Sequence, residues 1–220
     1  MIVSNSETGR ARAVKEIAQG NLVAFRTDTF YGLGVNPFNA VGLSKLALIK
    51  QREHKPVLVL VSEVSQVERF FNRRTKVFEA LSARFWPGAL TIVEEAQMSL
   101  SEELTAGTKT IGVRLPEREA VREFVSLCGG ALTATSANAT GKAPARTATE
   151  AANYFPSIMV LDGGEAQSNK PSSVLDISSA PSVRLIREGA LTFTELQKAL
   201  RDVGIELLAN DQSATPNHHR

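Results

Sequence analysis

Three short polar stretches carry side chains that suit an anionic ligand. The first, "LALIKQREHKP", places Lys50 at the end of a predicted helix, with Arg52 and Lys55 ahead of Pro56. Residues two apart on a helix point to different sides, so Lys50 and Arg52 can converge only if the chain uncoils after Lys50, which Pro56 permits. Arg can bind two phosphate oxygens at once, and Lys acts as a point charge. The stretch therefore indicates either a polyphosphate site or a solvated helix end, where cations are also favourable.

The second stretch, "FRTDTFYGLG", reads as a strand that ends in Thr-Asp-Thr and then turns on Gly32 and Gly34. The hydroxyls of Thr27 and Thr29 would lie at a strand end, where open α/β sheets place their ligands. The alternative is a polar turn in which Asp28 caps backbone amides. This stretch alone does not decide between the two.

The third stretch, "ALTATSANATGKAPAR", contains a Gly-Lys pair, Gly141-Lys142, that resembles part of a phosphate-binding loop. A Walker A loop, however, needs a Gly where Ser136 stands and a Ser or Thr where Ala143 stands. Instead, a predicted strand delivers Ser136 and Asn138, which point to the same side if the segment is extended. Both side chains donate and accept hydrogen bonds, which suits a nucleotide or an amino acid, although a plain strand-to-loop turn fits as well.

Several common kinds of active site are excluded. The chain has one cysteine, Cys128, and three histidines, His54, His218 and His219, which makes a zinc site or a nucleophile–His triad difficult to build. The sequence contains neither a G-x-S-x-G elbow nor a G-x-G-x-x-G dinucleotide fingerprint. Cations, hydroxyls and amides therefore remain as the groups that can carry chemistry.

Helical and extended periods alternate along the 220 residues, of which 43% are hydrophobic. The pattern predicts helices at 10–19, 41–50, 64–70, 75–85 and 118–127. It predicts strands at 22–25, 57–61, 89–94, 110–115, 131–136, 158–162, 173–177 and 183–187. Capping boxes at Thr147–Glu150 and Thr192–Glu195 start two more helices. We expect an α/β fold with a twisted mixed open sheet and flanking helices, in one domain over 1–207 with a loose tail at 208–220.

Charge and hydropathy limit the class of protein. Lys and Arg number 25 against 23 Asp and Glu, which is not the dense basic footprint of a dedicated nucleic-acid binder but leaves room for a local basic patch. The chain opens with no basic segment followed by an apolar run, and no stretch reaches the roughly 18 apolar residues that a membrane span needs. The single cysteine is typical of a reducing compartment. We expect a cytoplasmic protein that does not associate with a membrane.

Taken together, these stretches resemble the YrdC/TsaC-like family of threonylcarbamoyl-AMP synthases, which also includes YciO-like paralogues. The resemblance runs from about residue 10 to residue 190 and includes "TDTFYGLG", "FWPGALTIV", "TIGVRLP", "TSANATGKAPARTATE", "SSVLDIS" and "LIREGAL". The family pairs a K-x-R motif with an S-x-N motif, matched here by Lys50, Arg52, Ser136 and Asn138. The resemblance implies a large, positively lined cavity and a reaction that converts L-threonine, bicarbonate and ATP into threonylcarbamoyl-AMP and pyrophosphate.

The resemblance also assigns roles to individual residues. It implies catalysis by Lys50 and Arg52, and ATP binding by Lys50, Arg52, Lys55, Thr110, Asn138, Arg146 and Arg187. It implies threonine binding by Thr29, Arg114, Ser136 and Ser172. A structural ion pair is the alternative for Arg114. Mg²⁺ would come with ATP and be held by phosphates and water, with no dedicated protein metal site.

The family further implies that the product is passed to the tRNA threonylcarbamoyl transferase complex. One departure is Arg26, where a Pro is common, which would alter the strand end or add a cation near the cavity; another is a short spacing ahead of Lys55. A YciO-like paralogue of weak or different activity is one alternative. Others are a non-catalytic RNA-binding or ribosome-associated module for tRNA or double-stranded RNA, and a carbamoyl-phosphate-using domain of the hydrogenase-maturation kind.

Overall fold

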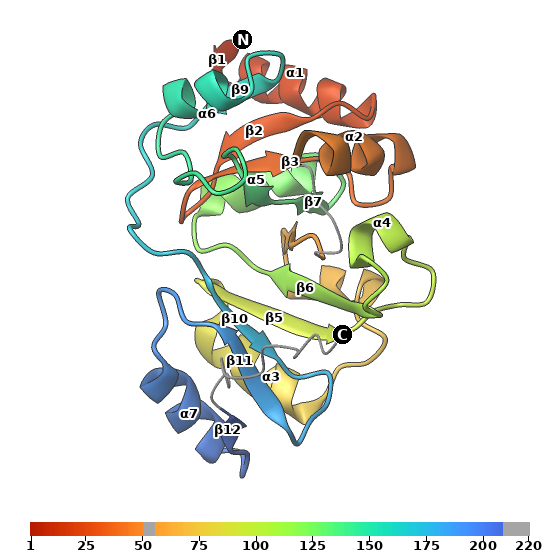
Figure 1. The fold of residues 1–220 in the computed structure, drawn as a ribbon, viewed down its shortest axis with the longest axis vertical. Helices are drawn as coiled ribbons and strands as arrows, with labels where there is room; N and C mark the ends of the chain where they lie inside the picture. The colour runs from red at the N-terminus through yellow and green to blue at the C-terminus, as the bar shows by residue number, and fades with distance from the viewer. Residues whose placement is uncertain (51–55, 209–220) are drawn as a thin grey trace, which may run out of the picture.

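The computed structural model describes residues 1–50 and 56–208 as two β-sheets with helices packed on them (Figure 1). One sheet has five strands in the order β1-β9-β2-β3-β8, and the other has seven in the order β12-β11-β10-β5-β6-β4-β7. Both contain parallel and antiparallel neighbours, such as β2 with β9 and β2 with β3, so the predicted mixed α/β architecture is confirmed. Within the described ranges, no helix is both long and apolar enough to span a bilayer.

The five-stranded sheet consists of β1 (Ile2–Ser4), β9 (Met159–Asp162), β2 (Val23–Arg26), β3 (Tyr31–Gly34) and β8 (Thr135–Ser136). The seven-stranded sheet consists of β12 (Leu207–Leu208), β11 (Val183–Arg187), β10 (Ser173–Asp176), β5 (Leu90–Glu95), β6 (Thr110–Arg114), β4 (Val59–Val61) and β7 (Ala131–Thr133). The helices are α1 (Glu7–Ala18), α2 (Ala40–Lys50), α3 (Lys76–Phe85), α4 (Glu102–Thr105), α5 (Glu119–Leu127), α6 (Ala148–Tyr154), α7 (Phe193–Arg201) and the 3-10 helix η1 (Val64–Arg69).

Side-chain caps set several helix starts. The predicted capping boxes of Thr147 and Thr192 are both present, at the starts of α6 and α7. Helix α1 begins three residues earlier than predicted, because the Ser6 side chain accepts the backbone N–H of Gly9 and caps the first turn. The segment predicted as a helix at 64–70 is a 3-10 helix, and the short elements β1, α4 and β12 were not predicted.

The segment after Thr29 is a strand, so the predicted turn on Gly32 and Gly34 is wrong. Residues 31–34 form β3, which pairs antiparallel with β2 and is fully buried. A Cβ at Gly34 would lie 2.8 Å from a ring carbon of Phe25 and 2.9 Å from a methyl of Leu132. This glycine therefore permits close packing of the sheet rather than a change of chain direction.

The single strand predicted at 131–136 is also wrong, because the chain changes sheets within it. Strand β7 belongs to the seven-stranded sheet and β8 to the five-stranded sheet. At the crossing, the Ala134 N–H donates to the Leu58 carbonyl at 2.8 Å, and the Val35 N–H donates to the Thr133 hydroxyl at 2.9 Å. A short apolar run has the same pattern whether it forms one strand or two. The crossing brings the polar loop after β8 to the junction of the sheets.

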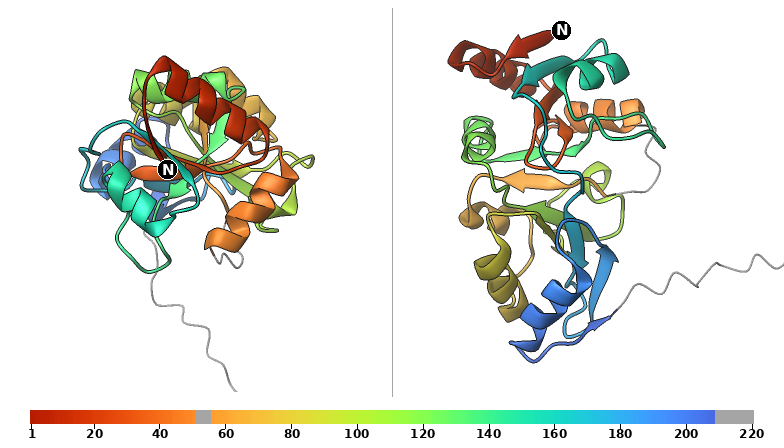
Figure 2. Two further views of the ribbon diagram at one scale, coloured as in Figure 1. Left: turned by 90° about the horizontal axis from the view of Figure 1, so that it is seen from above. Right: turned by 90° about the vertical axis from the view of Figure 1, so that its left-hand side faces the viewer.

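The two sheets share a hydrophobic core. The larger apolar cluster includes Ala24 and Leu33 from the five-stranded sheet and Val59 and Ile92 from the seven-stranded sheet. A second cluster lies beneath α1 and α5, and Figure 2 (right) shows α1, α5 and α3 along one side of the molecule. The shared packing fixes the distance between the sheets, and with it the space in which ligand-binding side chains can meet.

Candidate active site

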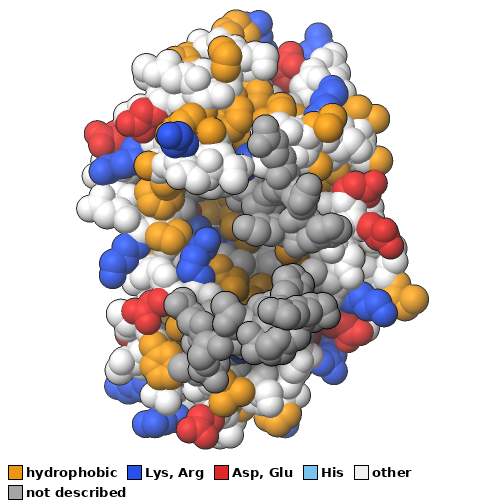
Figure 3. Space-filling model, viewed as in Figure 1, with side chains coloured by type: hydrophobic (Ala, Val, Ile, Leu, Met, Phe, Trp, Pro, Cys, Tyr) orange, Lys and Arg blue, Asp and Glu red, His pale blue; other side chains and the backbone are white. Residues whose placement is uncertain are grey.

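A cavity of about 670 Å³ lies between the two sheets, and Figure 3 shows the face of the molecule hollowed there. This volume is typical of small-molecule sites. Six residues predicted to bind ligands line it: Thr29, Thr110, Arg114, Ser136, Ser172 and Arg187. Three arginines line the cavity against one carboxylate, Asp176, so the described lining carries a surplus of positive charge.

Arg114, at the end of β6, is only 2% exposed and is held from three directions. Its guanidinium forms an ion pair with Asp28, its Nε donates to the Gly88 carbonyl at 2.9 Å, and its Nη1 donates to the Thr29 hydroxyl at 3.4 Å. Burial lowers the pKa of Arg114, an effect that Asp28 opposes. Arg114 thus forms the ion pair of the structural alternative and also lines the cavity, so its role in binding threonine stays a prediction.

The turn that carries Asp28 is organised by threonine hydroxyls. The Thr27 hydroxyl donates to the Phe30 carbonyl at 2.7 Å and accepts the backbone N–H groups of Thr29 and Phe30. These three bonds use the proton and both lone pairs of the Thr27 oxygen, and the Thr29 hydroxyl lies 3.1 Å from it. The turn thus fixes the Thr29 hydroxyl and directs Asp28 towards Arg114.

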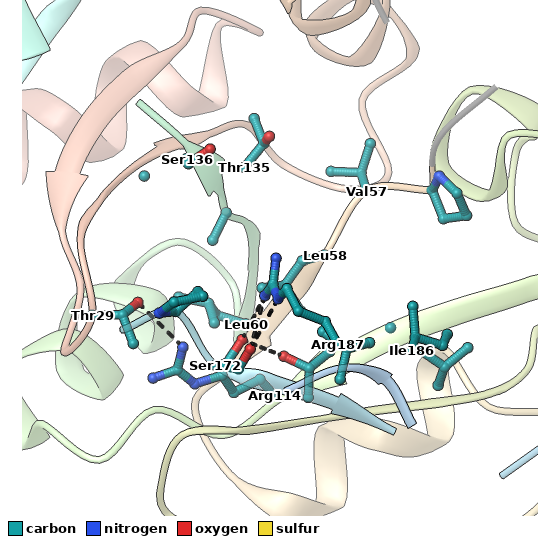
Figure 4. Close-up of a pocket in the computed structure, with 18 of the residues that line it drawn as sticks. Thr29, Val57, Leu58, Leu60, Arg114, Thr135, Ser136, Ser172, Ile186 and Arg187 are labelled. Atoms are coloured by element: carbon teal, nitrogen blue, oxygen red, sulfur yellow. Dashed lines mark hydrogen bonds between the residues drawn. The ribbon is translucent and has the colours of Figure 1, made fainter. Parts of the chain in front are cut away.

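Arg187, at the end of β11, contacts Ser172. Its Nη2 donates to the Ser172 carbonyl at 2.9 Å and to the Ser172 hydroxyl at 3.3 Å (Figure 4). The side chain stays accessible from the cavity, yet partial burial lowers the pKa of Arg187, and the positive charge of Arg114 lowers it further. Two guanidinium groups near each other are favourable for binding an anion between them.

Lys50 ends α2, as predicted, and contacts the S-x-N loop from 86 residues away in sequence. Its Nζ donates to the carbonyls of Ser136 at 2.8 Å and Asn138 at 2.5 Å, and the Lys50 carbonyl accepts the Thr140 hydroxyl. The Asn138 amide donates to the Lys142 carbonyl at 2.6 Å, within the same loop. The structure therefore brings together three of the four motif residues, but Lys50 and Asn138 do not line the large cavity.

The remaining sites that the sequence suggested lie elsewhere. Arg52 and Lys55 fall outside the described residues. Arg146 pairs with Glu165 at 3.2 Å, outside the cavity lining, so its nucleotide role stays a prediction. Arg26 donates to the Gly163 carbonyl at 2.6 Å and is not part of the described cavity lining, so the consequence of this departure stays a prediction.

Thr91 and Tyr31 are among the cavity residues that the sequence interpretation missed. Thr91 lines the cavity from β5, with its hydroxyl 2.9 Å from that of Ser172. The Tyr31 hydroxyl donates to the Gly164 carbonyl at 2.8 Å, and burial, followed by the charge of Asp162, raises the pKa of Tyr31 to about 12. The signal for Thr91 was available, because side chains of a strand alternate and Val93 faces the cavity too.

One family model and several named relatives match this chain. The family model described as "Telomere recombination", which groups Sua5, YciO and YrdC proteins, matches residues 15–189. A Pyrococcus abyssi protein named threonylcarbamoyl-AMP synthase is 32% identical over 86% of this chain and 56% of its own length. A Thiobacillus denitrificans protein of the same name is 31% identical over 76% of this chain and 90% of its own length.

The comparison with solved structures agrees with the sequence comparison. A crystal structure of P. abyssi Sua5 complexed with L-threonine superposes with a TM-score of 0.87 at 29% identity, over 94% of this chain and 62% of that one. The chain thus spans little more than half the length of the Pyrococcus relative. Since the family model covers most of the sequence, this chain belongs to the Sua5/YciO/YrdC family.

Proposed function

We propose that this protein is an L-threonylcarbamoyladenylate synthase, a nucleotidyltransferase that forms threonylcarbamoyl-AMP and pyrophosphate from L-threonine, bicarbonate and ATP. Relatives that carry this name, and the likeness to a Sua5 structure holding L-threonine, support the proposal. The observation that carries it is the convergence of six predicted ligand-binding residues in a cavity of about 670 Å³. The polar groups of these six side chains are hydroxyls and guanidiniums.

The chemistry needs charge neutralisation more than it needs a strong base. The threonine amine takes up the carbon dioxide of bicarbonate, with loss of water, to give an N-carboxylate. One oxygen of that carboxylate then bonds to the α-phosphorus of ATP, while the bond from this phosphorus to the pyrophosphate oxygen breaks. Two anions must meet, so the fixed cations Arg114 and Arg187 would lower the barrier by offsetting their repulsion.

Each group of side chains has a place in this proposal. Thr29, Ser136, Ser172 and Arg114 would hold threonine and its N-carboxylate. Lys50, Arg52, Lys55 and Arg187 would hold the triphosphate. Thr110, Asn138 and Arg146 would approach the nucleoside. Because Lys50 and Asn138 bind each other in the structure, we propose that phosphate oxygens replace some of the loop oxygens around the Lys50 ammonium.

Mg²⁺ would enter as the MgATP complex. The described residues contain no group of three or more His, Cys, Asp or Glu side chains that could form a metal cage. Asp176, the carboxylate in the described lining, pairs with Arg184 at 3.2 Å. This arrangement fits a cation held mainly by phosphate oxygens and water.

The product would be consumed in the cytoplasm by a tRNA threonylcarbamoyl transferase complex. A mixed anhydride of a carbamate and a phosphate is prone to hydrolysis, so the proposal includes transfer to that complex soon after formation. Direct binding of tRNA or double-stranded RNA would help such a transfer, and its strength should fall steeply with salt.

The test is pyrophosphate release from ATP, with L-threonine and bicarbonate omitted in turn and threonylcarbamoyl-AMP detected by mass spectrometry. We expect release only when both are present. Folded protein that binds RNA in a salt-dependent way but leaves ATP intact would support the RNA-binding alternative. Conversion of ATP to ADP and phosphate, or release that ignores threonine, would contradict the proposed reaction.

A further inference from the structure

A buried hydrogen-bond chain crosses three neighbouring strands on the floor of the cavity. Thr91 on β5 is 3% exposed, and its hydroxyl lies 2.9 Å from that of Ser172, which immediately precedes β10. The Ser172 hydroxyl accepts Nη2 of Arg187 on β11 at 3.3 Å. Since β10 lies between β5 and β11, the chain from Thr91 to Arg187 runs across the sheet.

The chemistry of these groups gives the chain a direction. Arg is only a donor, so one lone pair of the Ser172 oxygen is used by Arg187. If Thr91 donates to the other lone pair, the Ser172 proton is left for an acceptor in the cavity. An anionic ligand oxygen is such an acceptor, and it would also be attracted to Arg187.

Packing holds the Thr91 side chain in the orientation that this requires. Gly112 on β6 leaves space for the Thr91 methyl, because a Cβ at Gly112 would lie 3.2 Å from it. Strand β5 lies between β6 and β10, so the methyl of Thr91 faces one neighbouring strand while its hydroxyl faces the other. The β-branched side chain is therefore fixed by both of its branches.

We propose that Thr91 is a positioning residue of this site. It donates to the Ser172 hydroxyl, turns the Ser172 proton towards an anionic oxygen of the substrate, and thereby keeps the Arg187 guanidinium in its binding position. The inference rests on the proposed function, because the anionic oxygen belongs either to the carboxylate of L-threonine or to a phosphate of ATP.

The test compares Thr91→Val, which keeps the shape and removes the hydroxyl, with Thr91→Ser, which keeps the hydroxyl. The control is Thr105→Val: Thr105, on α4, is also buried, and its hydroxyl donates to the carbonyl of Ser101, the residue that precedes α4; neither residue lines the cavity. We expect Thr91→Val to raise the KM of one substrate about 10-fold, with a smaller change in kcat, and Thr91→Ser to stay within about 3-fold of wild type. Thr105→Val should leave both constants unchanged.

The substrate whose KM rises identifies the source of the anion, and calorimetric titration with L-threonine checks the result without turnover. If Thr91→Val folds poorly, Gly112→Ala provides a second perturbation, since its methyl crowds that of Thr91; the same KM should rise. Wild-type kinetics in Thr91→Val, or an equal defect in Thr91→Ser, would overturn the inference alone. A folded wild type that neither releases pyrophosphate nor binds L-threonine would overturn the proposed function and the inference with it.

Discussion

The two sheets hold the cations of the candidate site in different ways. On the seven-stranded sheet, Arg114 and Arg187 project from the ends of strands, and each guanidinium is held by oxygens from other segments. On the five-stranded side, Lys50 is held by carbonyls of a loop, and the loop is held in turn by Lys50 and by Asn138. The arginines are thus part of a rigid wall, whereas Lys50 and its loop depend on each other.

This difference has a consequence for binding. Arginine side chains that are already held in place lose little conformational entropy when an anion binds. A loop tied to one ammonium can exchange its carbonyl oxygens for phosphate oxygens and rearrange as it does so. We therefore expect the arginine wall to contribute affinity from the start, and the Lys50 loop to respond to the nucleotide.

The largest effect is expected from Arg114→Leu. This change leaves the Asp28 carboxylate buried without its partner, so the free energy of unfolding should fall by about 3–5 kcal/mol. Urea denaturation measures it. The control is Arg184→Leu in the same cavity, whose side chain is 59% exposed and pairs with Asp176, and which should cost about 1 kcal/mol or less.

A second substitution separates the lost ion pair from the lost packing. Adding Asp28→Asn to Arg114→Leu should restore part of the stability, because the uncompensated buried charge is then gone. Equal losses for Arg114→Leu and Arg184→Leu would contradict the description of the arginine wall as rigid and buried.

The next effect is expected from Lys50→Met. Loss of the charged hydrogen bonds should cost about 1–3 kcal/mol of stability, and pyrophosphate release should fall by about 100-fold. Hydrogen exchange should quicken at the Asn138 and Lys142 amides, which donate within the loop. Lys198→Met, at an exposed position of α7, should change neither quantity. A loop that exchanges as slowly without Lys50 would show that the ammonium does not hold it.

Much of the fold could be predicted because it depends on local patterns. Alternation and capping located most long elements, and the capping boxes at Thr147 and Thr192 form as expected. The prediction failed where the outcome depends on distant partners. Residues 131–136 divide between two sheets, and Gly34 is needed for contact with Phe25 and Leu132, which local sequence does not reveal.

In the candidate site too, local features could be predicted and contacts between distant residues could not. The resemblance named six residues that meet in the cavity, but it gave no sign that Asp28 pairs with Arg114 across 86 residues or that Arg26 bonds to Gly163. Thr91 was missed although strand alternation places it with Val93 on the cavity face, because an isolated Thr in an apolar run is also typical of any strand.

The smallest effect tests what happens to a buried charge on the other face of β5. Glu94 is fully buried; its Oε1 accepts the Glu95 N–H and lies 3.7 Å from Arg73 Nε, while its Oε2 has no hydrogen-bond partner among the described residues. Burial raises the pKa of Glu94 above its ordinary value of 4.5, an effect that the Glu95 N–H and Arg73 oppose. A carboxyl whose pKa is raised by folding stabilises the fold below pH 4.5, and that stability is lost as the pH rises through the raised pKa.

Glu94→Gln should therefore raise the free energy of unfolding at neutral pH by about 1 kcal/mol and reduce its decline with pH just above 4.5. Urea denaturation over a pH series measures both, with Glu95→Gln at the exposed neighbouring position as the control. A gain for Glu94→Gln beside a large loss for Arg114→Leu would show that this sheet tolerates buried charge only where a partner of opposite sign is fixed against it. A loss of stability in Glu94→Gln would instead mean that Arg73 compensates Glu94 as fully as Asp28 compensates Arg114.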